Sequence, residues 1–163
     1  MKIYTLGTSN RSIKEFLEIL KTYQIQVVVD VRRWPTSKLF PHFKKENLKK
    51  VLKENKIKYY HFENLGGFRE EGYLEYTKTK QFKEALKKII RILKSKPTVI
   101  VCAERFPWKC HRALIGKELE KDGIKVVHII EKDRIWEPKK EPKEIKPKCQ
   151  KPYFLKRMTK NLA

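Results

Sequence analysis

Short β-branched stretches alternate with segments of helical periodicity along most of this chain, and this alternation constrains its fold most strongly. The sequence predicts strands at residues 2–6, 26–31, 57–62, 98–101 and 125–130. Between them it predicts four helices, at about residues 12–20, 48–55, 82–93 and 111–121. Strands joined by helices form right-handed crossovers and a mainly parallel sheet. We therefore expect an α/β fold, a three-layer Rossmann-like domain with a five-stranded sheet.

Local signals at the element ends agree with this alternation. Ser12 and Glu15 have the spacing of a capping box, which satisfies backbone N–H groups at the start of a helix. Gly123 stands just past the last predicted helix, where a left-handed backbone favours glycine. The continuous β-branched run at 26–31 is typical of a strand that is buried on both faces.

The composition divides the chain into two parts. Residues 1–131 carry the alternating pattern, and a chain of 163 residues with 40% apolar side chains can bury a core. Residues 132–163 instead contain Pro138, Pro142, Pro147 and Pro152 among many lysines. We predict an α/β domain over 1–131 and an extended Pro/Lys-rich C-terminal arm over 132–163. Such an arm fits two roles, an anion-binding segment or a solubilising tail.

The cysteine content and hydropathy predict the compartment. No stretch approaches the roughly 18 apolar residues of a membrane span, and Met1 leads directly into a predicted strand rather than a signal peptide. The three cysteines do not form the even-numbered framework of a disulfide-rich secreted domain. We therefore expect a cytoplasmic protein with free thiols and no membrane partner.

The charge is strongly unbalanced. Lys and Arg number 40 against 19 Asp and Glu, which gives a formal net charge of +21. Such an excess favours polyanions, and nucleic acid is the expected partner. A heat-adapted, lysine-rich surface is the alternative interpretation, although hyperthermophile proteins gain Lys and Glu together.

Polar side chains collect where the predicted strands end. Because the carboxyl ends of parallel strands share one edge of a sheet, we expect these side chains to converge on one crevice. The candidates for binding an anion or nucleic acid are Ser9, Asn10, Arg11, Asp30, Arg32, Arg33, Arg105 and Arg112. The candidates for catalysis are Cys102, Glu104, Cys110 and His111.

The helix predicted to begin near Cys110 or His111 gives these residues their chemistry. Its free N–H groups and positive dipole end would face the loop after Cys102, where they favour a phosphate and lower the pKa of a thiol. Either cysteine is then a candidate nucleophile. Two alternatives stay open: Cys102 is a small buried hydrophobic residue, and Glu104 is an ion-pair partner of an arginine rather than a proton-transfer group.

Metal binding is the less favoured interpretation of the same residues. Cys102, Cys110 and His111 are possible zinc ligands, with His61 as a fourth candidate, but seven residues separate the two cysteines. Structural zinc sites typically place cysteines two to four residues apart. From the sequence we therefore predict no metal and no cofactor.

Several segments match the pattern of a known family. They are Leu-Gly-Thr-Ser-Asn at 6–10, Val-Asp-Val-Arg at 29–32, Leu-Gly-Gly at 65–67, Cys-Ala-Glu at 102–104 and Cys-His-Arg at 110–112. In these segments the chain resembles the domain-of-unknown-function 488 family, from about residue 2 to residue 129. The resemblance implies a compact α/β domain whose matching residues line one pocket, and no established activity comes with it. A fainter similarity is to rhodanese-like domains, from which the long, nearly glycine-free loop after Cys102 departs.

Three functions are compatible with these features. The first is binding of nucleic acid, DNA or RNA, or of a nucleotide-like anion, with processing at the Cys/Glu/His/Arg pocket as a further step. The second is a thiol-dependent enzyme that acts on a small sulfur- or phosphate-containing substrate, with Cys102 as nucleophile. The third is a structural or adaptor domain whose polar turn is satisfied internally, so that loss of Arg32 or Arg112 would unfold it.

Overall fold

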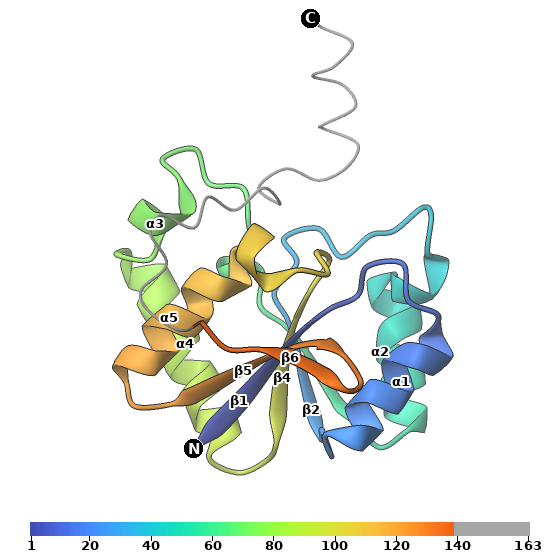
Figure 1. Cartoon of the computed structure of the whole chain (residues 1–163). Coiled ribbons are helices and arrows are strands. Elements are labelled where there is room, and N and C mark those ends of the chain that lie inside the picture. Colours follow the sequence, from blue (N-terminus) through green and yellow to red (C-terminus); the bar gives the residue numbers. More distant parts are fainter. Residues whose placement is uncertain (139–163) are drawn as a thin grey trace, which may run out of the picture.

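The computed structural model of the protein describes residues 1–138 (Figure 1). In this part of the chain the strands are β1 (Lys2–Gly7), β2 (Val27–Asp30), β3 (Lys58–His61), β4 (Thr98–Cys102), β5 (Lys125–Glu131) and β6 (Arg134–Trp136). The α-helices are α1 (Ile13–Thr22), α2 (Lys45–Glu54), α3 (Tyr73–Tyr76), α4 (Lys80–Leu93) and α5 (Arg112–Lys121). Short 3-10 helices are η1 (Pro41–Phe43), η2 (Glu63–Leu65) and η3 (Pro107–Lys109). Most of the predicted C-terminal arm, residues 139–163, lies outside the described residues.

The strands form one sheet in the order β3-β2-β4-β1-β5-β6, in which β1 to β5 are all parallel. This confirms the predicted α/β architecture with a mainly parallel sheet. β2 lies between β3 and β4, and its four residues are all buried, as its continuous β-branched run predicts. No helix in residues 1–138 combines the length and the apolar character that a membrane crossing requires.

The sheet has one strand more than the five predicted. β6 is antiparallel to β5, with Ile135 opposite Ile129 and Trp136 opposite His128. Trp136 also packs edge-on against Trp108, with ring centroids 5.6 Å apart. These residues fall in the predicted arm, because three residues are too few to show the alternation that marks a strand. The sheet therefore extends through Trp136, past the predicted boundary at residue 131.

Helices cover both faces of the sheet, with α1 and α2 on one side and α4 and α5 on the other (Figure 1). The core beneath α1 and α2 contains Phe16, Leu20, Leu48 and Leu52 with the sheet residues Leu6, Val28, Val99 and Val101. The core beneath α4 and α5 contains Phe82, Ile89, Ile115 and Leu119 with Ile3, Val27, Val29 and Ile100. Successive residues of β2 and β4 thus face opposite cores, which is why both strands are apolar throughout.

The helix ends follow the local signals in the sequence. Ser12 caps α1, since its hydroxyl accepts a hydrogen bond from the Glu15 N–H at 3.0 Å. The Glu15 side chain does not complete a capping box, because it contacts Arg11 instead. Gly123 follows the last residues of α5 with a φ of +78°, the left-handed conformation expected after a helix.

The loops that follow β1 and β4 are in direct backbone contact. Thr8 N–H donates to Cys102 O at 2.7 Å, and Ser9 N–H donates to Ala103 O at 2.8 Å. Gly7 allows this approach, because a Cβ atom at this position would lie 1.9 Å from Glu104 O. β1 and β4 are neighbours at the centre of the sheet. After β1 the chain continues to β2, toward one end of the sheet, and after β4 it continues to β5, toward the opposite end. The loops after β1 and β4 therefore lie where the strand order reverses.

Candidate functional site

The carboxyl ends of β1, β2 and β4 meet at one edge of the sheet. In the strand register Gly7 is paired with Cys102, and Asp30 is paired with Val101. The Val31 N–H extends this pairing by donating to Val101 O at 2.9 Å. The carboxyl ends of these three strands therefore share one edge of the sheet.

Asp30 and Arg32 form a buried ion pair at the end of β2. Arg32 donates from Nε at 2.9 Å and from Nη2 at 2.8 Å to the carboxylate, and the Tyr59 hydroxyl donates to it at 2.5 Å. Arg32 Nη1 donates to Phe43 O at 2.7 Å. Burial lowers the pKa of Arg32, but the Asp30 charge and its hydrogen bonds outweigh burial, so that the pKa is raised. Burial, reinforced by the same carboxylate, raises the pKa of Tyr59.

Arg112 is fully buried at the start of α5, and its guanidinium is used inside the protein. It donates to Thr5 Oγ1 at 3.2 Å, to Arg105 O at 2.9 Å and to Glu104 O. These bonds tie the loop after β4 to β1 and to α5. Arg112 was a candidate for anion binding in the sequence. In the structure it donates to backbone carbonyls of the loop after β4.

Arg11 has the same kind of environment beside β1. Its Nε donates to Gly7 O at 2.8 Å, its Nη2 donates to Ile130 O, and its Nη1 contacts the carboxylates of Glu15 at 3.1 Å and Glu131 at 3.3 Å. Burial lowers the pKa of Arg11. Since this side chain is fully buried as well, it cross-links β1, α1 and β5 and does not face solvent.

Other anion-binding candidates lie nearer the surface. Asn10 is exposed, and its side-chain oxygen accepts a hydrogen bond from Arg105 Nη2 at 2.9 Å. Arg105 also pairs with Glu131. Ser9, beside Asn10, has a positive φ of 48°, an uncommon conformation for a residue with a side chain.

Two further candidates have local partners of their own. Glu104 Oε1 accepts a hydrogen bond from the Phe106 N–H at 3.4 Å, within the loop after β4. The Arg33 guanidinium stacks over the Trp34 ring, 4.7 Å from its centroid, and donates to Phe68 O. Arg33 thus contacts the loop after η2, whereas Arg32 beside it faces Asp30.

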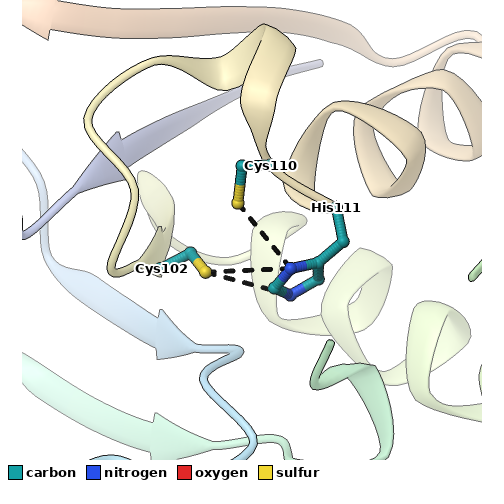
Figure 2. Close-up of side chains that lie close together, drawn as sticks. All are labelled: Cys102, Cys110 and His111. Atoms are coloured by element: carbon teal, nitrogen blue, oxygen red, sulfur yellow. Dashed lines mark hydrogen bonds between the residues drawn. The ribbon is translucent and has the colours of Figure 1, made fainter. Parts of the chain in front are cut away.

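Cys102, Cys110 and His111 form a buried cluster between the end of β4 and the start of α5 (Figure 2). His111 Nδ1 lies 3.8 Å from Cys102 Sγ and 3.7 Å from Cys110 Sγ. His111 Nε2 lies 3.3 Å from Val31 O, and the ring packs against Tyr73 with centroids 5.0 Å apart. Both sulfur atoms therefore face the same edge of one imidazole.

The charges of the cluster are coupled. Burial lowers the pKa of His111, but the Coulombic effect of Cys102 and Cys110 outweighs it and raises the pKa well above its usual value. Neither thiol is at the surface, since Cys102 is 3% and Cys110 0% exposed. A substrate would have to displace packed side chains to reach either sulfur, so the thiol-enzyme interpretation stays a prediction.

Three residues of this region were not among the sequence candidates. Tyr59 hydrogen-bonds Asp30, Glu131 links Arg11 with Arg105, and Tyr73 packs on His111 while donating to Leu65 O at 2.7 Å. Tyr59 had a usable signal, because it alternates with the exposed Tyr60 along β3. Tyr73 lies between residues 62 and 82, where the periodicity predicts no element, so its position beside His111 could not be predicted from spacing.

The fold and the site define an α/β domain with a buried cysteine–histidine cluster and a buried carboxylate–guanidinium pair at the carboxyl edge of a parallel sheet. The chain belongs to the family described as Domain of unknown function DUF488, whose model matches residues 12–119. The resemblance noted in the sequence is thereby confirmed. Searches of curated proteins and of solved structures found no match to this chain.

Proposed function

We propose that this protein binds nucleic acid through a cationic stripe on α4. The observation that carries the proposal is the exposed face of this helix, which presents Lys80, Lys83, Lys87, Lys88, Arg91 and Lys94 and a single acidic residue, Glu84. A cluster of lysines and arginines along one helix face is the electrostatic footprint of a nucleic-acid-binding protein.

The ion pairs of the described residues leave this stripe available to a polyanion. Lys80 lies 3.8 Å from Glu84, and within residues 1–138 no other cation of the stripe forms a salt bridge. By contrast, the buried Arg11 and Arg32 are each paired with carboxylates of the protein. The buried arginines at the strand ends are therefore already used inside the protein, whereas the cations of α4 are exposed.

The geometry of the stripe fits a phosphate backbone. Lys83, Lys87, Arg91 and Lys94 follow the i, i+4 and i, i+3 spacing of one helix face. With a rise of about 1.5 Å per residue, these four cations span roughly 16 Å along the axis. Such a row contacts several phosphates without reading bases, so the proposed binding is sequence-independent and strongly salt-dependent.

The test compares two variants with the same loss of charge. One replaces Lys83, Lys87 and Arg91 by Gln, and the control replaces Lys14, Lys21 and Lys49, exposed residues on α1 and α2, by Gln. Fluorescence anisotropy with a labelled DNA duplex is measured at several salt concentrations. Each lost phosphate contact removes about 0.9 from the slope of log K against log salt, so the α4 variant should lose roughly 2 to 3. A flat slope in the unmodified protein, or equal losses in both variants, contradicts the proposal.

A further inference from the structure

We propose that Cys102, Cys110 and His111 form a binding site for a zinc ion. The three side chains offer two sulfur atoms and one ring nitrogen that all lie within 4.8 Å of one another, and all three residues are buried (Figure 2). This site is separate from the cationic stripe on α4, and it does not depend on nucleic-acid binding.

The two sulfur–nitrogen distances in the cluster are close to those of tetrahedral coordination. Zinc binds cysteine sulfur at about 2.3 Å and histidine nitrogen at about 2.0–2.1 Å, which places a ligating sulfur and nitrogen roughly 3.5 Å apart. His111 Nδ1 is 3.8 Å from Cys102 Sγ and 3.7 Å from Cys110 Sγ. Small side-chain rotations therefore bring all three atoms to bonding distance from one centre.

The second nitrogen of the imidazole is held as in a zinc site. His111 Nε2 lies 3.3 Å from Val31 O, which can only accept a hydrogen bond. With Nε2 as the donor to this carbonyl, Nδ1 is the nitrogen that would bind the metal, and it lies near both sulfurs, although Nε2 is also only 3.9 Å from Cys102 Sγ. Histidines that bind metals commonly donate their other ring N–H to a backbone carbonyl, which fixes the ring orientation.

The backbone explains how two consecutive residues face one centre. Cys110 is extended, with φ −129° and ψ 146°, whereas His111 is helical, with φ −60° and ψ −19°. Side chains of consecutive residues alternate in an extended chain, but the change to helical backbone at His111 turns both toward Cys102 (Figure 2).

The loop between the two cysteines is closed by bonds that involve no cluster atom. η3 lies within this loop, and Arg112 donates to the carbonyls of Glu104 and Arg105. These contacts return Cys110 to the end of β4 despite the seven intervening residues. The seven-residue spacing between the cysteines argued against a metal site in the sequence. The folded loop nevertheless brings both cysteines to the same histidine.

Ligand chemistry and charge favour zinc over Ca²⁺ and Mg²⁺. The cluster contains sulfur and nitrogen and no carboxylate, which disfavours Ca²⁺ and Mg²⁺. Two thiolates cancel the charge of one Zn²⁺, so the complex places no net charge in this buried position. On binding, each thiol releases its proton to solvent, and two Zn–S bonds and one Zn–N bond replace bonds from the hydrated ion to water. One water stays on the zinc as the fourth ligand, the other waters leave, and no electron is transferred.

The direct test uses the full-length protein after treatment with a chelator and addition of zinc. We expect one zinc per chain by elemental analysis. X-ray absorption should show two sulfur neighbours at about 2.3 Å and nitrogen at about 2.0–2.1 Å. A chain that retains no zinc after desalting, or a coordination shell without sulfur, overturns the proposal.

Variants and labelling give an independent test of the ligands. Cys102→Ser and Cys110→Ser should each weaken zinc binding at least about 100-fold, whereas His42→Gln, which changes an imidazole outside the cluster, should not. Should a serine variant fail to fold, the unmodified protein is labelled with iodoacetamide in mild urea, where transient opening exposes the buried thiols, because bound zinc should slow modification of Cys102 and Cys110. Equal labelling rates with and without zinc contradict the site.

Discussion

Arg112 donates hydrogen bonds to the backbone carbonyls of both Glu104 and Arg105, so the start of α5 is bound to the loop that follows β4. The same guanidinium reaches Thr5 on β1. One buried side chain thus joins the two strands between which the strand order reverses. Arg112 therefore holds the loop after β4 in place beside β1.

Replacement of Arg112 by Ala should destabilise the protein by about 3 kcal/mol or more, because three acceptors in a buried environment lose a charged donor. The free energy of unfolding from urea titration gives the measurement. Arg91→Ala, at an exposed position on α4, serves as control and should change this quantity by less than about 0.5 kcal/mol. Equal stability of Arg112→Ala and the unmodified protein would show that Arg112 is not structural.

Asp30→Ala should cost about 3 to 5 kcal/mol of folding free energy, because it leaves the Arg32 guanidinium buried without its carboxylate. Tyr59→Phe removes only one hydrogen-bond donor to Asp30, so it should cost roughly 1 kcal/mol. Chemical denaturation of the two variants side by side tests the difference. Similar losses for both would mean that the ion pair contributes no more than a single hydroxyl.

Gly7→Ala should destabilise the protein by about 3 kcal/mol or more, because the added methyl would overlap Glu104 O at 1.9 Å. The obstructing atom belongs to the backbone, so the loop after β4 must move as a whole. Gly116→Ala is the matched comparison, since its added Cβ would lie 3.1 Å from a side-chain methyl of Val126. Thermal unfolding should give a clearly lower Tm for Gly7→Ala, and the reverse order would contradict this account.

His128 should make stability fall in mildly acidic solution. Burial, and then the positive charge of Arg112, lowers the pKa of His128 to about 3, although Cys110 opposes this shift. The ring also contacts Thr5, whose hydroxyl lies 2.7 Å from Nδ1, and Trp136. Because the unfolded chain takes up a proton near pH 6.5 and the folded chain only near pH 3, folding stability is complete above pH 6.5 and declines below it.

The expected slope in this window approaches 1.4 kcal/mol per pH unit from His128 alone. Free energies of unfolding measured between pH 4 and pH 7 for the protein and for His128→Asn isolate this contribution. His42→Asn, at a half-buried histidine, provides the control. Parallel pH profiles of the protein and His128→Asn would show that His128 is protonated in the folded state.

The architecture was accessible from sequence because it depends on local patterns. The β-branched run before Asp30 and the spacing of Phe82, Leu86, Ile89 and Leu93 identify a buried strand and an amphipathic helix without knowledge of their neighbours. β6 was missed for the same reason, because three residues are too short to carry a period. The edge at which Asp30, Arg32 and Cys102 meet was also predictable, since parallel strands share their carboxyl ends.

The sequence by itself determined the alternation of elements, the excess of positive charge and the edge of the sheet where polar residues gather. Only the tertiary structure decided what those residues face. It directs Arg11, Arg32 and Arg112 inward, to acceptors inside the protein, and it brings two cysteines separated by seven residues to one imidazole. The physical reason is that burial obliges each polar group to find a partner, and that partner is set by packing in three dimensions rather than by spacing along the chain.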